Sequence, residues 1–391
     1  MKSYIKSIIF YSIFFLLLLS FFLTAIAVPE EIEPNFSSIY SKSFLVFDRN
    51  SENVILESNG YQKNYIASTT KIMTCILALE HGNLDDLVEI SKKATSINGS
   101  KLNLKSNSKI YLKDLLYGLM LRSGNDAAIA IAEHISGSID NFSILMNEKA
   151  KELGLTTTHF TSPHGLDNKE HFSSCYDLAV LTNYALKNDN FKKIVSTNST
   201  YISLNNVSTR INSTNNLLRE YSGFYGVKTG FTFNAGRCLV SAYKKDDFDI
   251  IIVTLNANSN IQRTKDTIFL KNYILENYKT ISLKNDIYSA FNNFLNENKE
   301  LYFKSFPESK ITLSDTFSNI DKFIIEKNSN VSFKINIQPI LSYNNFIGNK
   351  IGNFNIYNDG KILSSIDIIL SSEIKKLDFK FYLSYLLSEV I

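Results

Sequence analysis

Three short segments hold the side chains of this 391-residue sequence that are best suited to chemistry. They are Ser68-Thr69-Thr70-Lys71, Ser123-Gly124-Asn125 and Lys228-Thr229-Gly230, in that order along the chain. A serine hydroxyl beside a lysine amine forms a nucleophile with its base, and a second cation can lower the pKa of that amine or hold a carboxylate. Together the three segments indicate acyl transfer by a serine without a histidine.

The spacing of Ser68 and Lys71 fits one face of a helix. From Ala67 to Glu80 the apolar residues follow a helical period, and Gly82 supplies a stop. Residues three apart share a helix face, so Lys71 is expected beside the Ser68 hydroxyl, where the helix N-terminus favours negative charge. A solvated lysine is protonated near neutral pH, so a base at Lys71 requires burial or a second cation, for which Lys228 is the candidate. The alternative is a helix-capping serine with a surface lysine.

The second and third segments lie where a side chain can face a cleft. Ser123 and Asn125 fall in a break within a helical region, residues 113–136, although a helix cap is the alternative, which Asp126 could itself supply. Lys228 lies in a β-rich run, where a charge is unfavourable unless the strand borders a cleft or solvent. Gly230 leaves space for an extended peptide along an edge strand; the alternative is an exposed lysine on a hairpin.

The elements around these segments predict one domain of mixed structure. Strands are expected at 44–48, 53–57, 226–233, 238–244 and 249–256. Helices are expected at 67–80, 113–136, 141–153, 177–187 and 263–278, with a loop at 162–167. A hairpin, then many helices, then strands and a final helix describe an α+β or α/β sandwich domain that ends near residue 280.

The chain after residue 280 carries no chemical motif. Alternating segments at 332–337, 353–357 and 364–370, with little helical periodicity, predict a small β-rich domain over residues 281–373. The last stretch, residues 374–391, places apolar side chains on one helical stripe, with lysines crowded at its start. This helix could lie on a membrane surface as a peripheral contact, or it could pack on the second domain.

The N-terminal segment has the pattern of a secretory signal. Lys2 and Lys6 precede an apolar run from Ile8 to Ala27, and the run ends in Ala25-Ile26-Ala27 before an acidic, proline-containing stretch. A cleaved signal peptide over residues 1–27 is expected. A retained transmembrane helix is the alternative, because about twenty apolar residues can span a bilayer. In either case the rest of the chain is exported.

Composition argues against several classes of protein. Without Lys2 and Lys6 the formal net charge falls from +3 to +1 and no basic block is present, so nucleic acid is not an expected partner. The three cysteines, Cys75, Cys175 and Cys238, are expected to be core thiols rather than a disulfide framework. The five histidines include no pair at the i, i+4 spacing of a helical zinc site, so no metal is expected, and no cofactor either.

In this order, the three segments resemble the active-site signature of penicillin-interacting serine enzymes. The form Ser-Gly-Asn at 123–125 is more similar to D-alanyl-D-alanine carboxypeptidases than to class A β-lactamases, whose second motif is usually Ser-Asp-Asn. The similarity extends to residues 125–128, 163–174 and 226–232, and it covers about residues 35–280. It implies an α+β, β-lactamase/transpeptidase-like catalytic domain over residues 28–280, in which helices flank an antiparallel sheet.

The resemblance also assigns catalytic roles to individual residues. Ser68 would be the acylated nucleophile and Lys71 its general base. Ser123 and Asn125 would relay a proton and hold the substrate amide, and Lys228 would support the site electrostatically.

Further residues would bind the substrate. Thr229, with Arg263 at the start of the last helix, would hold the terminal carboxylate beside Gly230. The backbone N–H groups of Ser68 and Phe231 would form the oxyanion hole. Phe231 departs from the histidine or tyrosine that often stands there in the family, which removes a polar side-chain role but leaves the backbone N–H.

The resemblance implies a serine D-alanyl-D-alanine carboxypeptidase that trims peptidoglycan stem peptides through an acyl-Ser68 intermediate, with β-lactams as inhibitors. A β-lactamase is a rival, but it needs a deacylating glutamate, and Asp167 and Glu170 are the only acids between Pro163 and Ser174. A non-catalytic wall-binding protein is a third reading, although every residue needed for catalysis is present.

Overall fold

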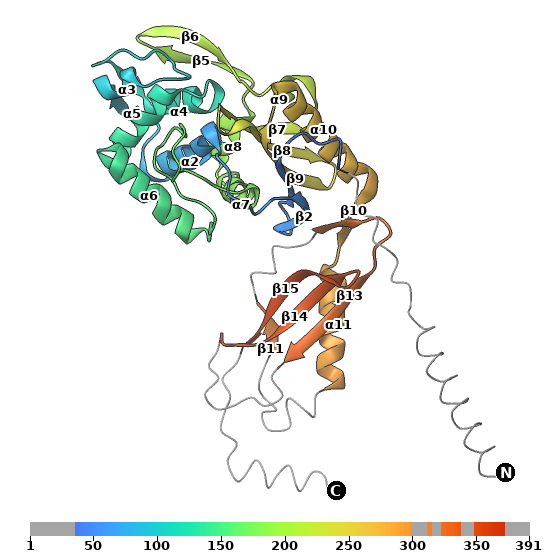
Figure 1. Ribbon diagram of the computed structural model, residues 1–391. Helices are drawn as coiled ribbons and strands as arrows, with labels where there is room; N and C mark the ends of the chain where they lie inside the picture. The colour runs from blue at the N-terminus through green and yellow to red at the C-terminus, as the bar shows by residue number, and fades with distance from the viewer. Residues whose placement is uncertain (1–35, 299–310, 315–321, 338–347, 372–391) are drawn as a thin grey trace, which may run out of the picture. The chain divides into compact units, whose positions relative to one another are not determined.

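The computed structural model describes residues 36–298, 311–314, 322–337 and 348–371 (Figure 1). The expected signal peptide at 1–27 and the expected terminal helix at 374–391 lie outside these ranges. Within them, no helix is both long enough and apolar enough to cross a membrane. Two hydrophobic cores organise the described chain, one drawn from residues 45–255 and the other from residues 283–370.

A five-stranded antiparallel sheet contributes to the first core. Its strand order is β2-β1-β9-β8-β7, and each neighbouring pair is antiparallel. The strands are β1 (Ser43–Asp48), β2 (Asn53–Ser58), β7 (Phe224–Thr232), β8 (Gly236–Lys245) and β9 (Phe248–Ala257). The expected hairpin and the three later strands are confirmed. The segment with Lys228 and Gly230 lies on β7, which is the expected edge strand.

The side chains of β9 point alternately to the two faces of the sheet, and both faces are covered by other elements. Ile251 and Val253 pack into the first core with the helices. Thr254 points the other way, and its Oγ1 lies 3.4 Å from Oγ1 of Thr267 in α10 (Asn260–Asn277). Because successive strand residues face opposite sides, α10 covers one face of the sheet and the helical region covers the other (Figure 1).

Most of the first core comes from the helices between β2 and β7. They are η1 (Ala67–Thr70), α2 (Lys71–His81), α3 (Lys92–Ser96), α4 (Leu112–Leu121), α5 (Asn125–Ser136), α6 (Ile139–Glu152), α7 (Cys175–Ala185), α8 (Asp189–Ser196) and α9 (Leu217–Glu220). Two short hairpins lie among them, β3 (Leu87–Glu89) with β4 (Lys109–Tyr111) and β5 (Ser199–Leu204) with β6 (Val207–Asn212). The expected helices are confirmed. The short elements α3, α8 and α9 and the two hairpins are not among the expected elements. Helices α3 and α9 are too short to show a helical period, whereas the buried residues Phe191, Ile194 and Val195 of α8 do follow one.

Strands dominate the chain after residue 277, as expected. A four-stranded antiparallel sheet has the order β11-β15-β14-β13, and β10 pairs with β12. The strands are β10 (Tyr278–Ser282), β11 (Ile311–Leu313), β12 (Lys322–Glu326), β13 (Val331–Ile337), β14 (Lys350–Asn358) and β15 (Lys361–Leu370). The α+β class with a later β-rich region is therefore confirmed.

Two details of this later region differ from expectation. A helix, α11 (Lys284–Glu297), is not among the expected elements, although Ile287, Phe291 and Leu295 recur at a helical spacing; it buries Ile287 and Phe291 in the second core. Its several asparagines have low helix propensity, so packing rather than propensity stabilises it. The expected boundary near residue 280 also falls inside β10, where Thr280 pairs with Ile324.

Gly165 allows a loop to approach the segment that carries Ser68. Its φ is +81°, and a Cβ at this position would lie 1.9 Å from the carbonyl oxygen of Ala67 and 2.5 Å from Thr70 Oγ1. Both the backbone conformation and the lack of space exclude a side chain. The close packing of the loop against η1 therefore depends on a glycine.

We predict that Gly165→Ala destabilises the protein more than Gly137→Ala does. Both glycines have a positive φ, +81° and +75°, but a Cβ at Gly137 would meet nothing within 4 Å. Left-handed backbone costs a residue with a side chain about 1–2 kcal/mol at either site. Overpacking adds about 1–3 kcal/mol at residue 165 alone. Urea unfolding of the two variants measures this difference, and equal losses would contradict the close contact.

Candidate active site

Ser68 lies on η1, which leads directly into α2. Ala67 before it has φ +46°, a left-handed conformation that is unfavourable for a residue with a side chain. Gly230 of β7 packs against this turn, and a Cβ there would lie 3.1 Å from the backbone nitrogen of Ser68 and 3.0 Å from the carbonyl oxygen of Ile66. The edge strand thus approaches the serine more closely than a side chain would comfortably allow.

Lys71 is the first residue of α2 and is fully buried. Its Nζ lies 2.9 Å from Ser68 Oγ, 2.7 Å from Asn125 Oδ1 and 2.8 Å from the carbonyl oxygen of His164. The expected contact between Ser68 and Lys71 is present, while the other two oxygens come from distant parts of the chain. The protonation state of this amine decides what the serine can do.

The surroundings of Lys71 favour its neutral form. Burial and, second, the charge of Lys228 lower the pKa of Lys71 well below its ordinary value, and the carboxylate of Asp126 partly opposes this. Two of the three neighbouring oxygens are carbonyl oxygens, which only accept hydrogen bonds. A neutral amine donates its two hydrogens to Asn125 and His164 and presents its lone pair to the Ser68 hydroxyl. This is the arrangement of a general base.

Lys228 enters the site from the other side. Its cross-strand partner is Val240, which belongs to the first core, so its side chain points towards the helices and Lys71. Lys228 is 1% exposed, and its Nζ donates to the carbonyl oxygen of Thr229 at 2.8 Å. Burial and the charge of Arg263 lower the pKa of Lys228 to about 7. The alternative of an exposed lysine on a hairpin is therefore wrong.

Ser123 and Asn125 lie at the junction of α4 and α5. Ser123 has φ +60° and lines the same cavity as Ser68. Asn125 is 3% exposed; its Oδ1 accepts from Lys71, and its Nδ2 donates to the carbonyl oxygen of Asn98 at 2.7 Å. An amide nitrogen has two hydrogens, so one remains for another acceptor. The second segment thus both supports the base and borders the cavity.

Asp126 does not cap the helix, although the sequence offers it as a cap. Helix α5 begins without a side-chain cap, and the buried carboxylate of Asp126 accepts from the backbone nitrogens of Leu102 at 2.9 Å and Leu104 at 3.2 Å. These bonds hold residues 98–104 beside α5, where the loop accepts hydrogen bonds from both the side chain and the backbone of Asn125. The carboxylate therefore positions Asn125.

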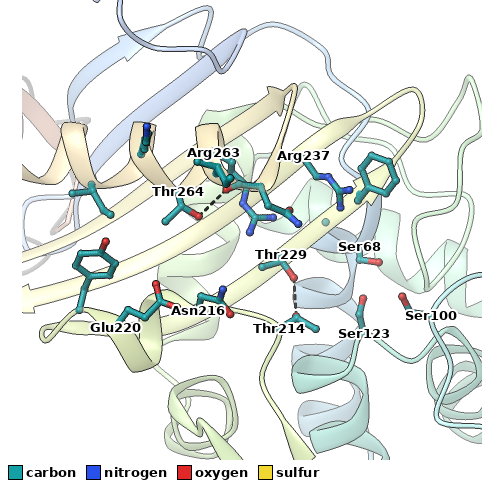
Figure 2. A pocket seen from close by; sticks show the side chains of 17 residues that line it. Ser68, Ser100, Ser123, Thr214, Asn216, Glu220, Thr229, Arg237, Arg263 and Thr264 are labelled. Carbon is teal, nitrogen blue, oxygen red and sulfur yellow. Dashed lines mark hydrogen bonds between the residues drawn. The ribbon is translucent and has the colours of Figure 1, made fainter.

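A cavity of about 690 Å³ opens in front of Ser68. Figure 2 shows Ser68 and Ser123 on one side of Thr229, and Asn216 and Glu220 on the other. The cavity is lined by residues from η1, the loop before α5, the region around α9, the end of β7 and α10. It is therefore longer than the contact between the serine and its base requires.

Arg263 reaches from α10 into this cavity near Thr229 (Figure 2). It is 6% exposed; its Nη1 donates to the carbonyl oxygen of Cys238 at 3.3 Å, and its buried Nε has no partner in the described part of the chain. Burial lowers the pKa of Arg263 to about 10, so the guanidinium stays charged at neutral pH. Thr229 Oγ1 in turn lies 2.9 Å from Thr214 Oγ1. A charged donor with an unused N–H beside a hydroxyl suits a carboxylate.

Sequence reasoning misses two groups of the site, Arg237 in the cavity and the backbone carbonyl of His164 beside Lys71. Arg237 of β8 stands opposite Phe231, and its Cζ lies 3.6 Å from the centre of the Phe231 ring. His164 supplies a backbone carbonyl, for which its side-chain type gives no signal. Only the resemblance of residues 163–174 to the family pointed to that loop. Burial, first, and then the charges of Lys71 and His171 lower the pKa of the His164 ring to about 3, so it stays neutral.

The remaining candidates from the sequence lie elsewhere. The three cysteines are free and buried, which confirms them as core thiols. Glu170 lines a separate pocket with Lys63 and Lys169, and not the cavity of Ser68. Asp167 accepts a hydrogen bond from Thr232 Oγ1 at 2.5 Å. In the ranges that the structure describes, no group of three histidine, cysteine or acidic side chains is arranged to hold a metal ion.

A serine with a buried lysine base, beside the edge of an antiparallel sheet and a second buried lysine, defines an active-site serine enzyme of acyl transfer. Residues 29–259 match the family model described as D-alanyl-D-alanine carboxypeptidase, and the chain belongs to this family.

Known proteins of this family are similar over most of the chain. The D-alanyl-D-alanine carboxypeptidase DacF of Bacillus subtilis is 31% identical over 373 residues, which are 93% of this chain and 93% of that protein. The crystal structure of penicillin binding protein 5 from Haemophilus influenzae has a TM-score of 0.70 and 25% identity, and it covers 86% of this chain and 98% of its own. A variant DD-transpeptidase of Streptomyces has a TM-score of 0.58 and 31% identity, and it covers 60% of this chain and 97% of its own. The expected family and transpeptidase-like fold are confirmed.

We predict that in Asp126→Asn the acylation rate falls off at a lower pH on the acidic side of its pH profile than in the wild-type protein. The Asp126 carboxylate raises the pKa of Lys71, so its loss lowers that pKa further and keeps the amine neutral in more acidic solution. The maximal acylation rate of the variant is also lower, because an amide accepts the hydrogen bonds from the backbone nitrogens of Leu102 and Leu104 less well than a carboxylate does. Acylation by a fluorescent penicillin from about pH 5 to pH 9 measures the pH profile. Asp114→Asn, which removes a buried carboxylate on α4, is the control. If the acidic fall in the acylation rate of Asp126→Asn occurs at the wild-type pH or at a higher pH, the Asp126 carboxylate does not raise the pKa of Lys71.

We predict that the stability of the wild-type protein rises with pH relative to Lys228→Met. The pKa of Lys228 is about 7 in the folded protein against 10.5 for a free lysine. Between these values the unfolded chain binds a proton that the folded protein does not, so the free energy of unfolding increases as pH rises through that window. Urea unfolding at several pH values measures the difference, with Lys193→Met as an exposed control. Parallel curves for wild type and Lys228→Met would disprove the shift.

Proposed function

We propose that this enzyme releases the terminal D-alanine from peptidoglycan stem peptides that end in D-Ala-D-Ala, through an acyl-Ser68 intermediate, in the making of the cell wall. The observation that carries this proposal is the contact of 2.9 Å between Lys71 Nζ and Ser68 Oγ in a buried, cationic setting. The substrate follows from the name that the family and DacF share.

The cavity suits both sides of the scissile bond. Thr229 and Arg263 both line the cavity and bind the terminal carboxylate, because a guanidinium and a hydroxyl are strong partners for it. Gly230 leaves room for the penultimate residue beside the nucleophile. The backbone N–H groups of Ser68 and Phe231 stabilise the carbonyl oxygen as negative charge develops on it.

Proton transfers connect the two chemical steps. Lys71 takes the hydroxyl proton while Ser68 Oγ bonds to the carbonyl carbon of the penultimate D-alanine. The C–N bond breaks, Ser123 relays the proton to the leaving amine, and D-alanine departs. Water then attacks the ester, Lys71 takes a proton from the water and passes it to Ser68 Oγ as the C–O bond breaks, and the shortened peptide leaves as a carboxylic acid. Lys228 remains close as a cation, and Asn125 holds the substrate amide with its free N–H.

We propose that β-lactams acylate the same serine and are released slowly. The relative from Haemophilus influenzae is named a penicillin binding protein, and this chain has the nucleophile and base that acylation needs. A β-lactamase would need an acid that activates water at the ester. Glu170 lines a different pocket, with Lys63 and Lys169, so we assign it no such role.

We propose that the enzyme is exported and acts outside the cytoplasm. The charged and apolar pattern of residues 1–27 supports a signal peptide. The separate second core supports a catalytic domain followed by a β-rich domain; because β10 pairs with β12, we place the boundary at the start of β10 rather than at residue 280. The apolar stripe of residues 374–391 supports a peripheral contact with the outer face of the membrane.

We predict that Ser68→Ala abolishes both D-alanine release and covalent labelling by penicillin. The free energy of unfolding changes by about 0.5 kcal/mol or less. Loss of the attacking hydroxyl explains the first result, and the partial exposure of Ser68 explains the second. Ser100→Ala is the matched control, because it removes another hydroxyl from the same cavity and should keep both activities.

Intact-protein mass after penicillin treatment measures the adduct, and peptide mapping locates it. An adduct at another residue, or labelling that survives in Ser68→Ala, would overturn the assignment. An adduct lost within seconds would instead indicate a β-lactamase.

A further inference from the structure

His171 is buried close to the turn that carries Ser68, but it does not line the cavity. Its side chain is 2% exposed, and its Nε2 lies 2.8 Å from Thr70 Oγ1. Its Nδ1 lies 3.0 Å from the backbone nitrogen and 3.3 Å from Oγ1 of Thr161. Both ring nitrogens thus have an uncharged partner, and the reaction proposed above assigns this ring no part.

The hydrogen bonds fix which nitrogen of His171 carries the proton. Burial, then the charges of His159 and Lys71, lower the pKa of His171 to about 4, so the ring is neutral at neutral pH. The backbone N–H of Thr161 can only donate, so Nδ1 accepts and the ring hydrogen is on Nε2. Nε2 therefore donates to the hydroxyl oxygen of Thr70.

The Thr70 hydroxyl continues this chain of hydrogen bonds to the backbone beside the nucleophile. Thr70 Oγ1 lies 2.7 Å from the carbonyl oxygen of Ala67, which only accepts, so the hydroxyl donates to it. Thr70 is fully buried and Ala67 is 2% exposed, so bulk water does not compete for these bonds. The donors therefore all point the same way, from the ring of His171 to the carbonyl of Ala67.

The Ala67 carbonyl and the Ser68 N–H belong to one peptide group. That group is planar and trans, so the two bonds point in opposite directions. A hydrogen bond that fixes the Ala67 oxygen therefore also fixes the direction of the Ser68 N–H, which the proposed reaction uses in the oxyanion hole. Because the φ of +46° at Ala67 is unfavourable, this orientation requires support from the surrounding structure.

We propose that His171 is a positioning residue of acyl transfer, which holds the Thr70 hydroxyl on the Ala67 carbonyl and so keeps the Ser68 N–H aimed at the developing oxyanion. The proposal rests on the proposed function, in which Ser68 is acylated, and it adds a residue that acts only through Thr70. A misaligned N–H stabilises the transition state less while initial binding is retained, so its loss slows the chemical step.

Two variants of His171 separate this role from a purely structural one. An asparagine amide reaches the place of Nδ1 of a histidine ring, and a glutamine amide reaches the place of Nε2. His171→Asn therefore keeps an acceptor for the Thr161 N–H but loses the donor to Thr70, whereas His171→Gln does the opposite. We predict that His171→Asn lowers the limiting acylation rate about tenfold, and that His171→Gln restores most of it.

Variants of Thr70 test the next hydrogen bond in the chain. Thr70→Val removes the hydroxyl at nearly constant shape and lowers the limiting rate about tenfold, whereas Thr70→Ser keeps the hydroxyl and most of the rate. Thr182→Val is the control, because the hydroxyl of Thr182 is also buried and donates to the carbonyl oxygen of Leu178 at 2.6 Å within α7. If His171 acts through Thr70, His171→Asn combined with Thr70→Val is no slower than Thr70→Val alone.

Acylation of the full mature enzyme by a fluorescent penicillin is measured over a range of concentrations. This separates the limiting rate, which is expected to fall, from the half-saturating concentration, which is expected to stay close to the wild-type value. Urea unfolding of each variant gives its stability, so that a loss of rate is compared with a loss of structure.

The proposal is overturned if His171→Asn acylates at the wild-type rate or if His171→Gln is slowed as much as His171→Asn. It is also overturned if the rate simply follows stability across the variants, Thr182→Val included. Should the His171 variants not fold, equal rates for Thr70→Val and Thr70→Ser overturn it. Absence of penicillin labelling at Ser68 in the wild-type enzyme would instead refute the proposed function, and this proposal with it.

Discussion

The structure of the site depends on the buried amine of Lys71, which forms no ion pair within the described part of the chain. Lys71 is in contact with three oxygens, and only one of them, Ser68 Oγ, comes from its own helical turn. Burial of a charge without a paired anion is costly, so the folded protein favours the uncharged amine. The other two oxygens, from Asn125 and His164, then orient that amine. The arrangement of α5 and of the loop before α7 relative to α2 is therefore a requirement of the base.

Backbone strain accompanies this arrangement. Ala67 and Ser123 both have a positive φ, which costs about 1–3 kcal/mol for residues of their type. Such conformations persist only where the surrounding structure determines them. Here, Gly165 and Gly230 pack against the turn that holds Ser68, and the first core fixes the elements behind them. The stability of the sheet and helices thus sustains a local geometry that is unfavourable on its own.

The sequence predicts the parts of the site that depend on local periodicity. The spacing of Ser68 and Lys71 on one turn, and the place of Lys228 on an edge strand, follow from helical and strand geometry. The contact between Asn125 and Lys71 joins residues 54 apart in the sequence, and no local pattern specifies it. The role of Asp126 is likewise not predictable from a local pattern, because its carboxylate binds the backbone of a loop more than twenty residues away and does not cap its own helix.

In the chain after residue 280, too, the sequence predicts some elements and misses another, for a different reason. Alternation of apolar residues predicts its strands, because each strand shows one face to a core. Helix α11 has apolar residues at a helical spacing, Ile287, Phe291 and Leu295, but its asparagines have low helix propensity. Ile287 and Phe291 stabilise it by packing in the second core with strands that are distant in sequence. Burial can therefore override propensity where a few apolar side chains reach a core.

Burial distinguishes the two lysines beside Ser68 from the side chains at the α9 end of the cavity. Lys71 and Lys228 are almost fully buried, so a change at either alters hydration, charge and packing together. Glu220 and Tyr221 are exposed on the short α9 segment, where substitutions usually change stability little. Asn215 anchors the start of this segment by donating to the carbonyl oxygen of Gly226 at 2.9 Å. The α9 end of the cavity can therefore vary in sequence while the distance between Lys71 Nζ and Ser68 Oγ stays fixed.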